Sequence, residues 1–306
     1  MTAMSETTTA RVPAPVGPAP VGAPPVRRSK GTGRNKPAGP LAYVGLVAAS
    51  VFAVLPLLWA LSTSLKSKGA VLSDSGWVPA APTLQNYATV LFDSQVPRYL
   101  LNSIVVAGGS VALTIVLALL GAYATARFQF RGRDASLFLI LMTSMIPGIA
   151  ILVPLYFLAV RTGLYDTYLG MVVVYTAWQV PTVLWMLRGF LQSIPASLEE
   201  AGRIDGAGDL RIMVQLVLPL AKPGIAAASV VAFVAVWNDF LIASTMVSSD
   251  HKRLVSVGLY NYLSQYGIEW GQLTAAVVVT VVPMILLFVL MEKRIVSGLS
   301  AGATKG

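Results

Sequence analysis

The sequence predicts an all-α integral membrane protein with six transmembrane helices. Three observations predict this fold class: 56% of the 306 residues are hydrophobic, only 11% are charged, and the mean hydropathy is +0.72. A water-soluble domain carries about 25% charged residues, so this composition cannot supply a surface that water solvates. The chain therefore exposes most of its surface to lipid, and its organisation is better counted in spans than in soluble domains.

Uncharged stretches mark the spans. A transmembrane helix needs about 20 mainly apolar residues, because each backbone polar group must find its partner inside the segment. Five stretches of this length contain no charged residue, and a sixth contains only Asp239. The six predicted spans are residues 41–65, 99–126, 135–160, 167–187, 223–249 and 270–291. Together they define a predicted transmembrane domain over residues 41–296.

Both ends of the chain are predicted to lie in the cytoplasm. Residues 1–40 hold eight prolines, a basic cluster and no long apolar run, which predicts a disordered tail and not a signal peptide. Residues 297–306 are rich in glycine and alanine and form a second predicted tail. With both tails inside, 16 of the 22 Lys and Arg residues fall on the cytoplasmic side. Cytoplasmic loops retain the excess of basic residues, so this topology is favoured.

The net charge of +9 is read as a topology signal and as attraction to anionic lipid. The basic residues are spread over several separate loops, which disfavours nucleic-acid binding. The chain has no cysteine, so disulfides and thiolate metal sites are excluded. His251 has no second histidine beside it and is interpreted as a solvated loop residue, so no metal site is predicted.

The cytoplasmic segment 195–219 has the pattern of two short helices in a hairpin. Ser197 and Glu200 have the spacing of a capping box, in which each side chain bonds a free amide at the start of a helix. Asp205 and Gly206 then form a turn signal, because glycine accepts the positive φ that a reversal needs. A first short helix is therefore predicted to begin at Ser197 and to stop at this turn.

The second helix of the hairpin is predicted from apolar residues on one helical face. They recur at the i, i+3, i+4 and i+7 positions, namely Leu210, Met213, Val214 and Val217. This helix is expected to end at Pro219, where the chain turns towards the membrane. By pattern alone, the hairpin is either a plain connection between two spans or a docking element.

The hairpin residues resemble the EAA loop of binding-protein-dependent ABC importers. In that loop an acidic-Ala-Ala triplet, a glycine and an apolar-Leu-Pro ending stand at this spacing. The matching positions are Glu200, Ala201, Gly206, Leu216, Leu218 and Pro219, and the run Asp205, Gly206 and Ala207 resembles the carbohydrate branch of the family. Gly202 replaces the second alanine of the triplet and keeps the position small. Further motifs, among them Asn102-Ser103, Ala122-Tyr123-Ala124 and Trp237-Asn238-Asp239-Phe240, resemble carbohydrate permeases of the maltose type.

The resemblance covers residues 41–306 and implies a type I ABC importer permease fold. It implies that the hairpin docks into a cytoplasmic ATPase subunit and that the chain forms half of a sugar pathway. The implied partners are a second homologous permease subunit, two ABC ATPase subunits, an extracytoplasmic solute-binding protein and membrane lipid. The chain has no GxxxxGK[ST] motif, so ATP and Mg are expected on the partner ATPase, with no cofactor and no enzyme activity on this chain.

Six residues in the spans are candidates for the substrate pathway: Trp237, Asn238, Asp239, Trp178, Gln179 and Thr143. An ionisable residue in a span is costly in lipid, so Asp239 either lines the route or bonds a neighbouring helix. The tryptophans either stack on a sugar ring or pack between helices. The polar side chains either bind sugar hydroxyls or join helices.

Two other classes of protein remain as alternatives. An ion-coupled secondary carrier usually needs several ionisable residues inside its spans, whereas this chain has only Asp239 well inside a predicted span. A membrane enzyme or a structural scaffold is disfavoured because no catalytic constellation is visible. The energy source of uptake would separate a carrier from an ATP-driven importer.

Overall fold

The structure is a computed structural model that describes residues 39–264 and 267–303. The predicted tail over residues 1–40 lies almost entirely outside the described residues, as do residues 304–306. The chain divides into two units, Met1–Val51 and Phe52–Gly306. The described part of the first unit is the first half of one helix, and the packing described below belongs to the second unit.

Five helices in the described part of the chain are long and apolar enough to cross a membrane. These are α1 (Pro40–Ser64), α4 (Val96–Arg127), α7 (Tyr168–Ser193), α10 (Leu218–Asn238), which is the end of a longer helical stretch, and α13 (Trp270–Ala303). A sixth span exists if α5 (Arg133–Ser144) and α6 (Gly148–Arg161) are counted as one bent unit. The observed helices overlap all six predicted spans.

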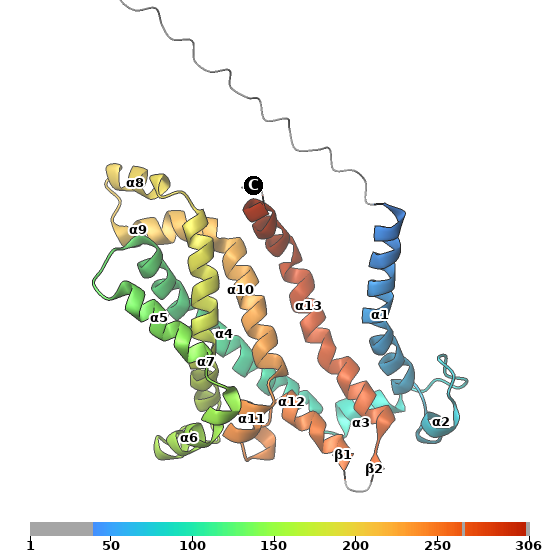
Figure 1. Cartoon of the computed structure of the whole chain (residues 1–306). Helices are drawn as coiled ribbons and strands as arrows, with labels where there is room; N and C mark the ends of the chain where they lie inside the picture. The colour runs from blue at the N-terminus through green and yellow to red at the C-terminus, as the bar shows by residue number, and fades with distance from the viewer. Residues whose placement is uncertain (1–38, 265–266, 304–306) are drawn as a thin grey trace, which may run out of the picture. The chain divides into compact units, whose positions relative to one another are not determined.

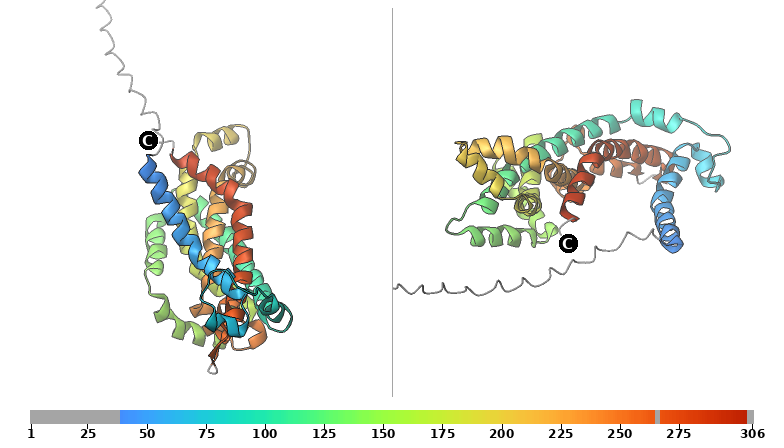
Figure 2. Two further views of the ribbon diagram at one scale, coloured as in Figure 1. Left: turned by 90° about the vertical axis from the view of Figure 1, so that its right-hand side faces the viewer. Right: turned by 90° about the horizontal axis from the view of Figure 1, so that it is seen from above.

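The span predicted over residues 135–160 is not one continuous helix. α5 and α6 meet at a bend of 97° across the break at residues 145–147, and the left-hand view of Figure 2 shows the two helices in green. Pro147 directly precedes α6 with φ −58° and ψ 126°, outside the helical region. Proline has no amide hydrogen and its ring clashes with the preceding turn, so a helix cannot run straight through it.

Two further boundaries differ from the prediction. The span predicted over 223–249 ends at Asn238, and α11 (Leu241–Met246) follows as a separate helix, because the chain leaves helical geometry at Asp239 with ψ 129°. The last span, predicted over 270–291, is only the first part of α13, which stays helical to Ala303. No proline follows Pro283, so nothing in the sequence forces that helix to end at the predicted tail.

The remaining elements are short. The helices are α2 (Lys68–Ser73), α3 (Gln85–Phe92), α8 (Ser197–Ile204), α9 (Asp209–Ile212) and α12 (Val255–Gly258), with 3₁₀ turns at Asp250–Lys252 and Leu259–Tyr262. A small antiparallel hairpin joins β1 (Leu263–Ser264) to β2 (Gly267–Ile268), with Leu263 opposite Ile268. Within residues 39–264 and 267–303, the regular structure is thus helical apart from four residues in strand geometry.

The core of the second unit lies where α4, α7 and α10 pack together, and α13 packs on α10 (Figures 1 and 2). Small buried residues let these helices approach closely: Ala118, Ala122, Ala228 and Ala232. Figure 1 shows α8 and α9 at one end of this unit and α6, α11 and α12 at the other. The two ends therefore carry different sets of loops.

Candidate functional site

The first arm of the 195–219 hairpin is α8, but its N-terminus differs from the prediction. The helix begins at Ser197, and the capping position is Ala196, with no capping side-chain hydrogen bond. The predicted capping box of Ser197 and Glu200 is therefore not formed. The reason is that Ser197 is already the first residue of the helix, and Ala196, which has no polar side chain, occupies the capping position and accepts from the amide of Glu200 at 3.1 Å. Of the two acids in the first turn, Glu199 is buried and Glu200 is exposed.

The turn of the hairpin forms as predicted. Asp205 follows the last residue of α8, and Gly206 has φ +80°. The amide of Ala207 donates to the carbonyl of Gly202 at 3.0 Å, which closes the turn. Only glycine enters this left-handed region without a steric penalty from a β-carbon, so the turn requires Gly206.

Gly202 is needed inside the hairpin itself. A β-carbon at this position would lie 3.3 Å from the side chain of Ile212, a buried residue of α9. Its small size therefore lets α8 pack closely on α9. Ala201, the neighbouring residue of the triplet, is exposed instead and offers a small surface to whatever docks there.

The second arm does not end at Pro219, contrary to the prediction. α9 passes through a π-helical segment, Met213–Val217, directly into α10, and Pro219 lies in the first turn of α10. The amide of Leu218 donates to the carbonyl of Met213, five residues back. The wider π turn accommodates a proline that lacks its own amide. The hairpin is thus joined to a membrane-spanning helix without a loop.

A buried ion pair, which the sequence analysis did not predict, fixes α8 to the bundle. Arg127 Nε donates to Glu199 Oε1 at 2.5 Å, and only 10% and 2% of these two side chains are exposed. The same guanidinium donates to the carbonyls of Leu191 at 2.9 Å and Ile194 at 3.0 Å. Tyr123 donates its hydroxyl to Glu199 Oε2 at 3.1 Å. We call Tyr123, Arg127 and Glu199 the anchor cluster.

Breaking a buried ion pair by removing one partner costs about 3–5 kcal/mol, because the other charge stays buried without compensation.

A sequence signal for the anchor cluster did exist. Tyr123 and Arg127 are four residues apart, so they share one face at the end of a span. A basic side chain at the end of a span favours an acidic partner. Glu199 and Glu200 are adjacent acids, so one can pair with Arg127 while the other stays exposed.

The outward face of the hairpin is available for a partner. Glu200 is exposed, and no hydrogen bond or ion pair of its carboxylate is found among the described residues. Ile204 is 86% exposed and Leu210 is 71% exposed, one on each arm. Arg203 and Asp209 bridge the two arms at 3.1 Å. The hairpin thus combines a free carboxylate with two uncovered apolar side chains.

The structure places three of the six pathway candidates at the contact of α7 with α10. Asp239 Oδ1 accepts from the hydroxyl of Tyr175 at 2.8 Å and from the amides of Ile242 and Ala243 at 2.9 and 3.2 Å. Gln179 Nε2 reaches the carbonyl of Ala232 at 3.4 Å. Trp237 is buried beside these residues and stacks on Phe233, with ring centroids 5.3 Å apart.

The other three candidates are exposed in this chain. Trp178 is partly exposed and lies against Gly148, where an added β-carbon would be 3.3 Å from its ring. Asn238 bonds the carbonyl of Val234, and Thr143 bonds that of Ile140, both within their own helices. The contacts of Asp239 favour helix joining over a free pathway carboxylate, and the roles of all six residues remain predictions.

A cavity of about 630 Å³ is lined by residues of segments that Figure 1 places at the end opposite the hairpin. It lies between α2, α3 and the first turn of α13 and is lined by residues such as Lys68, Asn86 and Trp270. None of the six pathway candidates lines this cavity. The sequence carries no local signal for this cavity, because its walls include Lys68 and Glu269, which are 201 residues apart.

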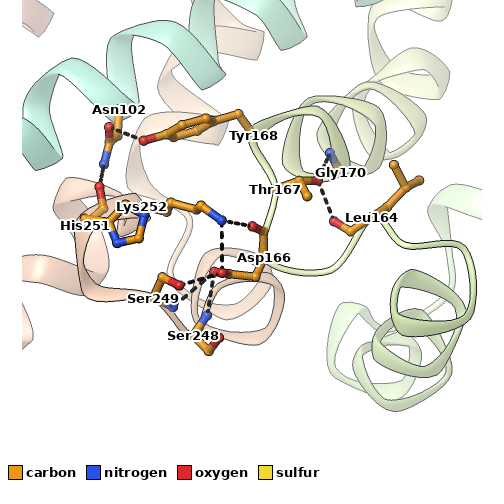
Figure 3. A network of polar contacts seen from close by, with 10 residues as sticks. All are labelled: Asn102, Leu164, Asp166, Thr167, Tyr168, Gly170, Ser248, Ser249, His251 and Lys252. Atoms are coloured by element: carbon orange, nitrogen blue, oxygen red, sulfur yellow. Dashed lines mark hydrogen bonds and ion pairs between the residues drawn. The ribbon is translucent and has the colours of Figure 1, made fainter.

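Figure 3 shows a second polar network, also far from the hairpin, centred on Asp166 in the turn between α6 and α7. Its carboxylate accepts from the amides of Ser248 and Ser249 at 3.2 and 3.0 Å and from Ser249 Oγ. Lys252 Nζ lies 3.1 Å from Asp166 Oδ2. Asp166 has φ +55°, a left-handed conformation that aspartate and asparagine tolerate better than other side chains.

Burial alone would raise the pKa of Asp166, but the hydrogen bonds from Ser249 and Ser248 and the ion pair with Lys252 hold it well below its usual range. The network therefore stabilises the fold fully above the unfolded-state pKa of about 3.9. This stabilisation is lost as the pH falls through the lower folded-state pKa.

We expect Asp166→Asn to lower the free energy of unfolding by about 1.5–3 kcal/mol at pH 7, because the hydrogen bonds lose a charged acceptor. Asparagine keeps the tolerance for positive φ, so the change tests the charge and the second acceptor oxygen without adding backbone strain. The difference from the parent protein should shrink below about pH 4. Unfolding in detergent followed by tryptophan fluorescence measures both effects. Asp93→Asn, at an exposed site, is the matched control and should change stability by less than about 0.5 kcal/mol.

Comparison with known proteins gives a family match. A family model described as "Binding-protein-dependent transport system inner membrane component" matches residues 115–300. The chain is 35% identical to the diacetylchitobiose uptake system permease protein NgcG of Streptomyces coelicolor, over 86% of this chain and 87% of the relative. It is 36% identical to the sulfoquinovosyl glycerol transport system permease protein SmoH of Agrobacterium fabrum, over 87% and 94%.

A third relative is the trehalose/maltose transport system permease protein MalG of Thermococcus litoralis, 33% identical over 87% of this chain and 96% of the relative. Among solved structures, a chain of a bacterial ABC transporter involved in the import of the polysaccharide alginate has a TM-score of 0.72 and 24% identity. The match covers 83% of this chain and 94% of that one, and at this identity it supports the fold alone.

Proposed function

The chain belongs to the family of binding-protein-dependent transport system inner membrane components, and we propose that it is the permease subunit of an ATP-binding-cassette importer for a sugar or oligosaccharide. The saccharide assignment is supported by relatives whose names specify diacetylchitobiose, sulfoquinovosyl glycerol and trehalose or maltose. These substrates differ in size and charge. We therefore assign recognition of the individual sugar mainly to a separate extracytoplasmic binding protein.

The observation that carries the proposal is the exposed face of the 195–219 hairpin. It presents the free carboxylate of Glu200 and the apolar side chains of Ile204 and Leu210. Apolar side chains on a loop outside the spans favour a protein partner that covers them. The partner that the motif implies is an ATPase subunit, which supplies the ATP and Mg site that this sequence lacks.

The proposed topology places the hairpin and both termini in the cytoplasm. The C-terminal end of α13 lies at the same end of the second unit as α8 and α9 (Figure 1). Basic residues at this end include Arg127, Arg188 and Arg211, as expected for the cytoplasmic side. The Asp166 network and the 630 Å³ cavity then face the extracytoplasmic side, where a solute-binding protein delivers the sugar.

The chain contributes half of the pathway in this proposal. A second, homologous permease subunit supplies the other half, and two ATPase subunits bind the two hairpins. The six pathway candidates are assigned to the substrate route or its supporting walls. Of these, Trp178, Asn238 and Thr143 have exposed surface in the single chain that a second subunit or a sugar would cover.

The alternative of an ion-coupled carrier is disfavoured by the family match and by the state of Asp239. Its carboxylate already accepts three hydrogen bonds from within the chain. A proton- or ion-coupling carboxylate would have to exchange such bonds for the coupled ion in each cycle.

The proposal predicts uptake that depends on ATP hydrolysis. The permease pair, the ATPase and the binding protein are reconstituted in liposomes with a radiolabelled saccharide that the binding protein retains. Uptake is expected with internal ATP and no ion gradient, and it should stop with an ATPase variant that binds ATP without hydrolysing it. Uptake driven by a proton or sodium gradient without ATP would contradict the proposal and favour the carrier.

A further inference from the structure

We propose that the anchor cluster of Tyr123, Arg127 and Glu199 is the joint through which movement of the hairpin reaches the spans α4 and α7. This inference rests on the proposed function, because it assumes that an ATPase moves the hairpin. It assigns three positioning residues that act through the helices they join, without touching a substrate.

Arg127 lies where α4 and α7 end side by side. It is the last residue of α4, and its guanidinium also bonds the carbonyls of Leu191 and Ile194 at the end of α7. These carbonyls belong to the final turn and the cap of α7, and that of Leu191 also accepts from the amide of Ile194 at 3.1 Å. One side chain thus ties the ends of two spans together and holds Glu199 of α8 at the same point.

Glu199 is held at two atoms. Arg127 bonds Oε1 and Tyr123 bonds Oε2, and both partners lie one turn apart on α4. A carboxylate bound at both oxygens cannot rotate freely relative to α4. The attachment is buried, with 2% of the Glu199 side chain exposed, so water does not compete for these bonds. Displacement of α8 therefore pulls on α4 directly.

Two adjacent acids of α8 have different roles. Successive residues of a helix point about 100° apart, so Glu199 and Glu200 face different directions on α8. Glu199 faces the bundle and Glu200 is exposed on the surface assigned to the ATPase. One face of α8 is thus bound to α4 through Glu199, and another face presents Glu200 to the proposed ATPase.

The other arm of the hairpin reaches the spans by a different route. It continues through the π segment into α10 as one helical stretch. The anchor cluster serves α4 and α7, which the chain connects to α8 only through residues 194–196. Without the cluster, a push on the hairpin would reach α4 and α7 only through the 194–196 connection and through their apolar packing on α10, with no polar bond among the described residues between α8 and these spans.

The test separates transmission from mere support of the fold. Glu199→Gln or Arg127→Met alone leaves one buried charge unpaired and should lower stability. The double variant Glu199→Leu with Arg127→Met removes both charges, which is often neutral for stability when the replacements fill the space. If the cluster only supports the fold, the double variant regains both stability and transport.

We expect the double variant to assemble with the ATPase and to unfold near the parent temperature. We also expect sugar uptake per ATP hydrolysed to fall about tenfold, since coupling between sites of this kind is typically worth 5-fold to 150-fold. Tyr123→Phe keeps the ring and removes one bond, so it should lower the same ratio by about threefold. If the double variant does not assemble with the ATPase, Tyr123→Phe alone still tests the inference by the same ratio.

An uptake-to-hydrolysis ratio equal to that of the parent, in Tyr123→Phe and in any double variant that assembles, would overturn the inference. Failure of the proposed function gives a different result, because the parent complex itself would then show no ATP-dependent uptake. The parent measurement is made in the same liposomes as the variants, so the two failures are read separately.

Discussion

Sugar uptake is expected to be abolished when Glu200 is replaced by alanine or Gly206 by valine. Alanine at position 200 removes the exposed carboxylate that the ATPase is proposed to bind. Valine at position 206 must adopt φ +80°, which costs at least about 1–2 kcal/mol for a residue with a β-carbon and more for a branched one. The turn would relax and the two arms would no longer present one face. Uptake of labelled sugar in whole cells measures both effects.

Gly208→Val is the matched control for Gly206→Val. Gly208 has φ −72° and ψ 160°, an extended conformation that valine adopts easily, and open space surrounds its missing β-carbon. This variant should retain most of its uptake. Normal uptake by Glu200→Ala or Gly206→Val, with the ATPase still bound, would show that the hairpin does not have the proposed role.

The second large effect is expected from Gly170→Ala, near the start of α7. A β-carbon at this position would lie 2.0 Å from the carbonyl oxygen of Leu164, a backbone atom that no side-chain rotation can move. Figure 3 shows this turn, in which Thr167 bonds both Leu164 and Gly170 and Asp166 carries the polar network. We expect the free energy of unfolding to fall by about 3 kcal/mol or more, as in strongly overpacked sites.

The same substitution at Gly189, on the same helix, is the control. Nothing lies within 4 Å of a β-carbon at that position, and alanine is the better helix former by about 1 kcal/mol. Gly189→Ala should therefore be neutral or slightly stabilising. Thermal unfolding in detergent compares the two variants. Equal stability of Gly170→Ala and the parent would show that the α6–α7 turn is looser than the structure indicates.

Hydrophobicity and charge predicted all six apolar segments but not their breaks. The span predicted over residues 135–160 is divided at Pro147, and the sequence could not say whether that proline kinks a helix, as Pro154 and Pro181 can, or interrupts it. The outcome depends on whether neighbouring helices hold the chain straight through the proline. The early end of α10 was missed for a similar reason, since the chain leaves the helix at Asp239 to start α11.

The turn of the hairpin was predictable because its signal is local. Asp205 and Gly206 are adjacent, and the need for positive φ follows from glycine itself. The anchor cluster and the Asp166 network were not predicted, because Arg127 and Glu199 are 72 residues apart and Asp166 and Ser249 are 83 apart. The local pattern assigned a capping box to Ser197 and Glu200, and it could not show that the neighbouring Glu199 is buried against Arg127 and Tyr123.

Site-specific crosslinking is the decisive test of whether the 195–219 hairpin docks on a cytoplasmic ATPase, as proposed. The chain has no cysteine, so Ile204→Cys provides a single attachment point on the exposed face for a photoactivatable maleimide. Leu72→Cys, 84% exposed at the opposite end, is the control. We predict that the probe at position 204 crosslinks to the nucleotide-hydrolysing subunit and that the probe at position 72 does not. A cysteine at position 204 that never reaches this subunit, or that reacts with a membrane-impermeant thiol reagent outside intact cells, would contradict the account.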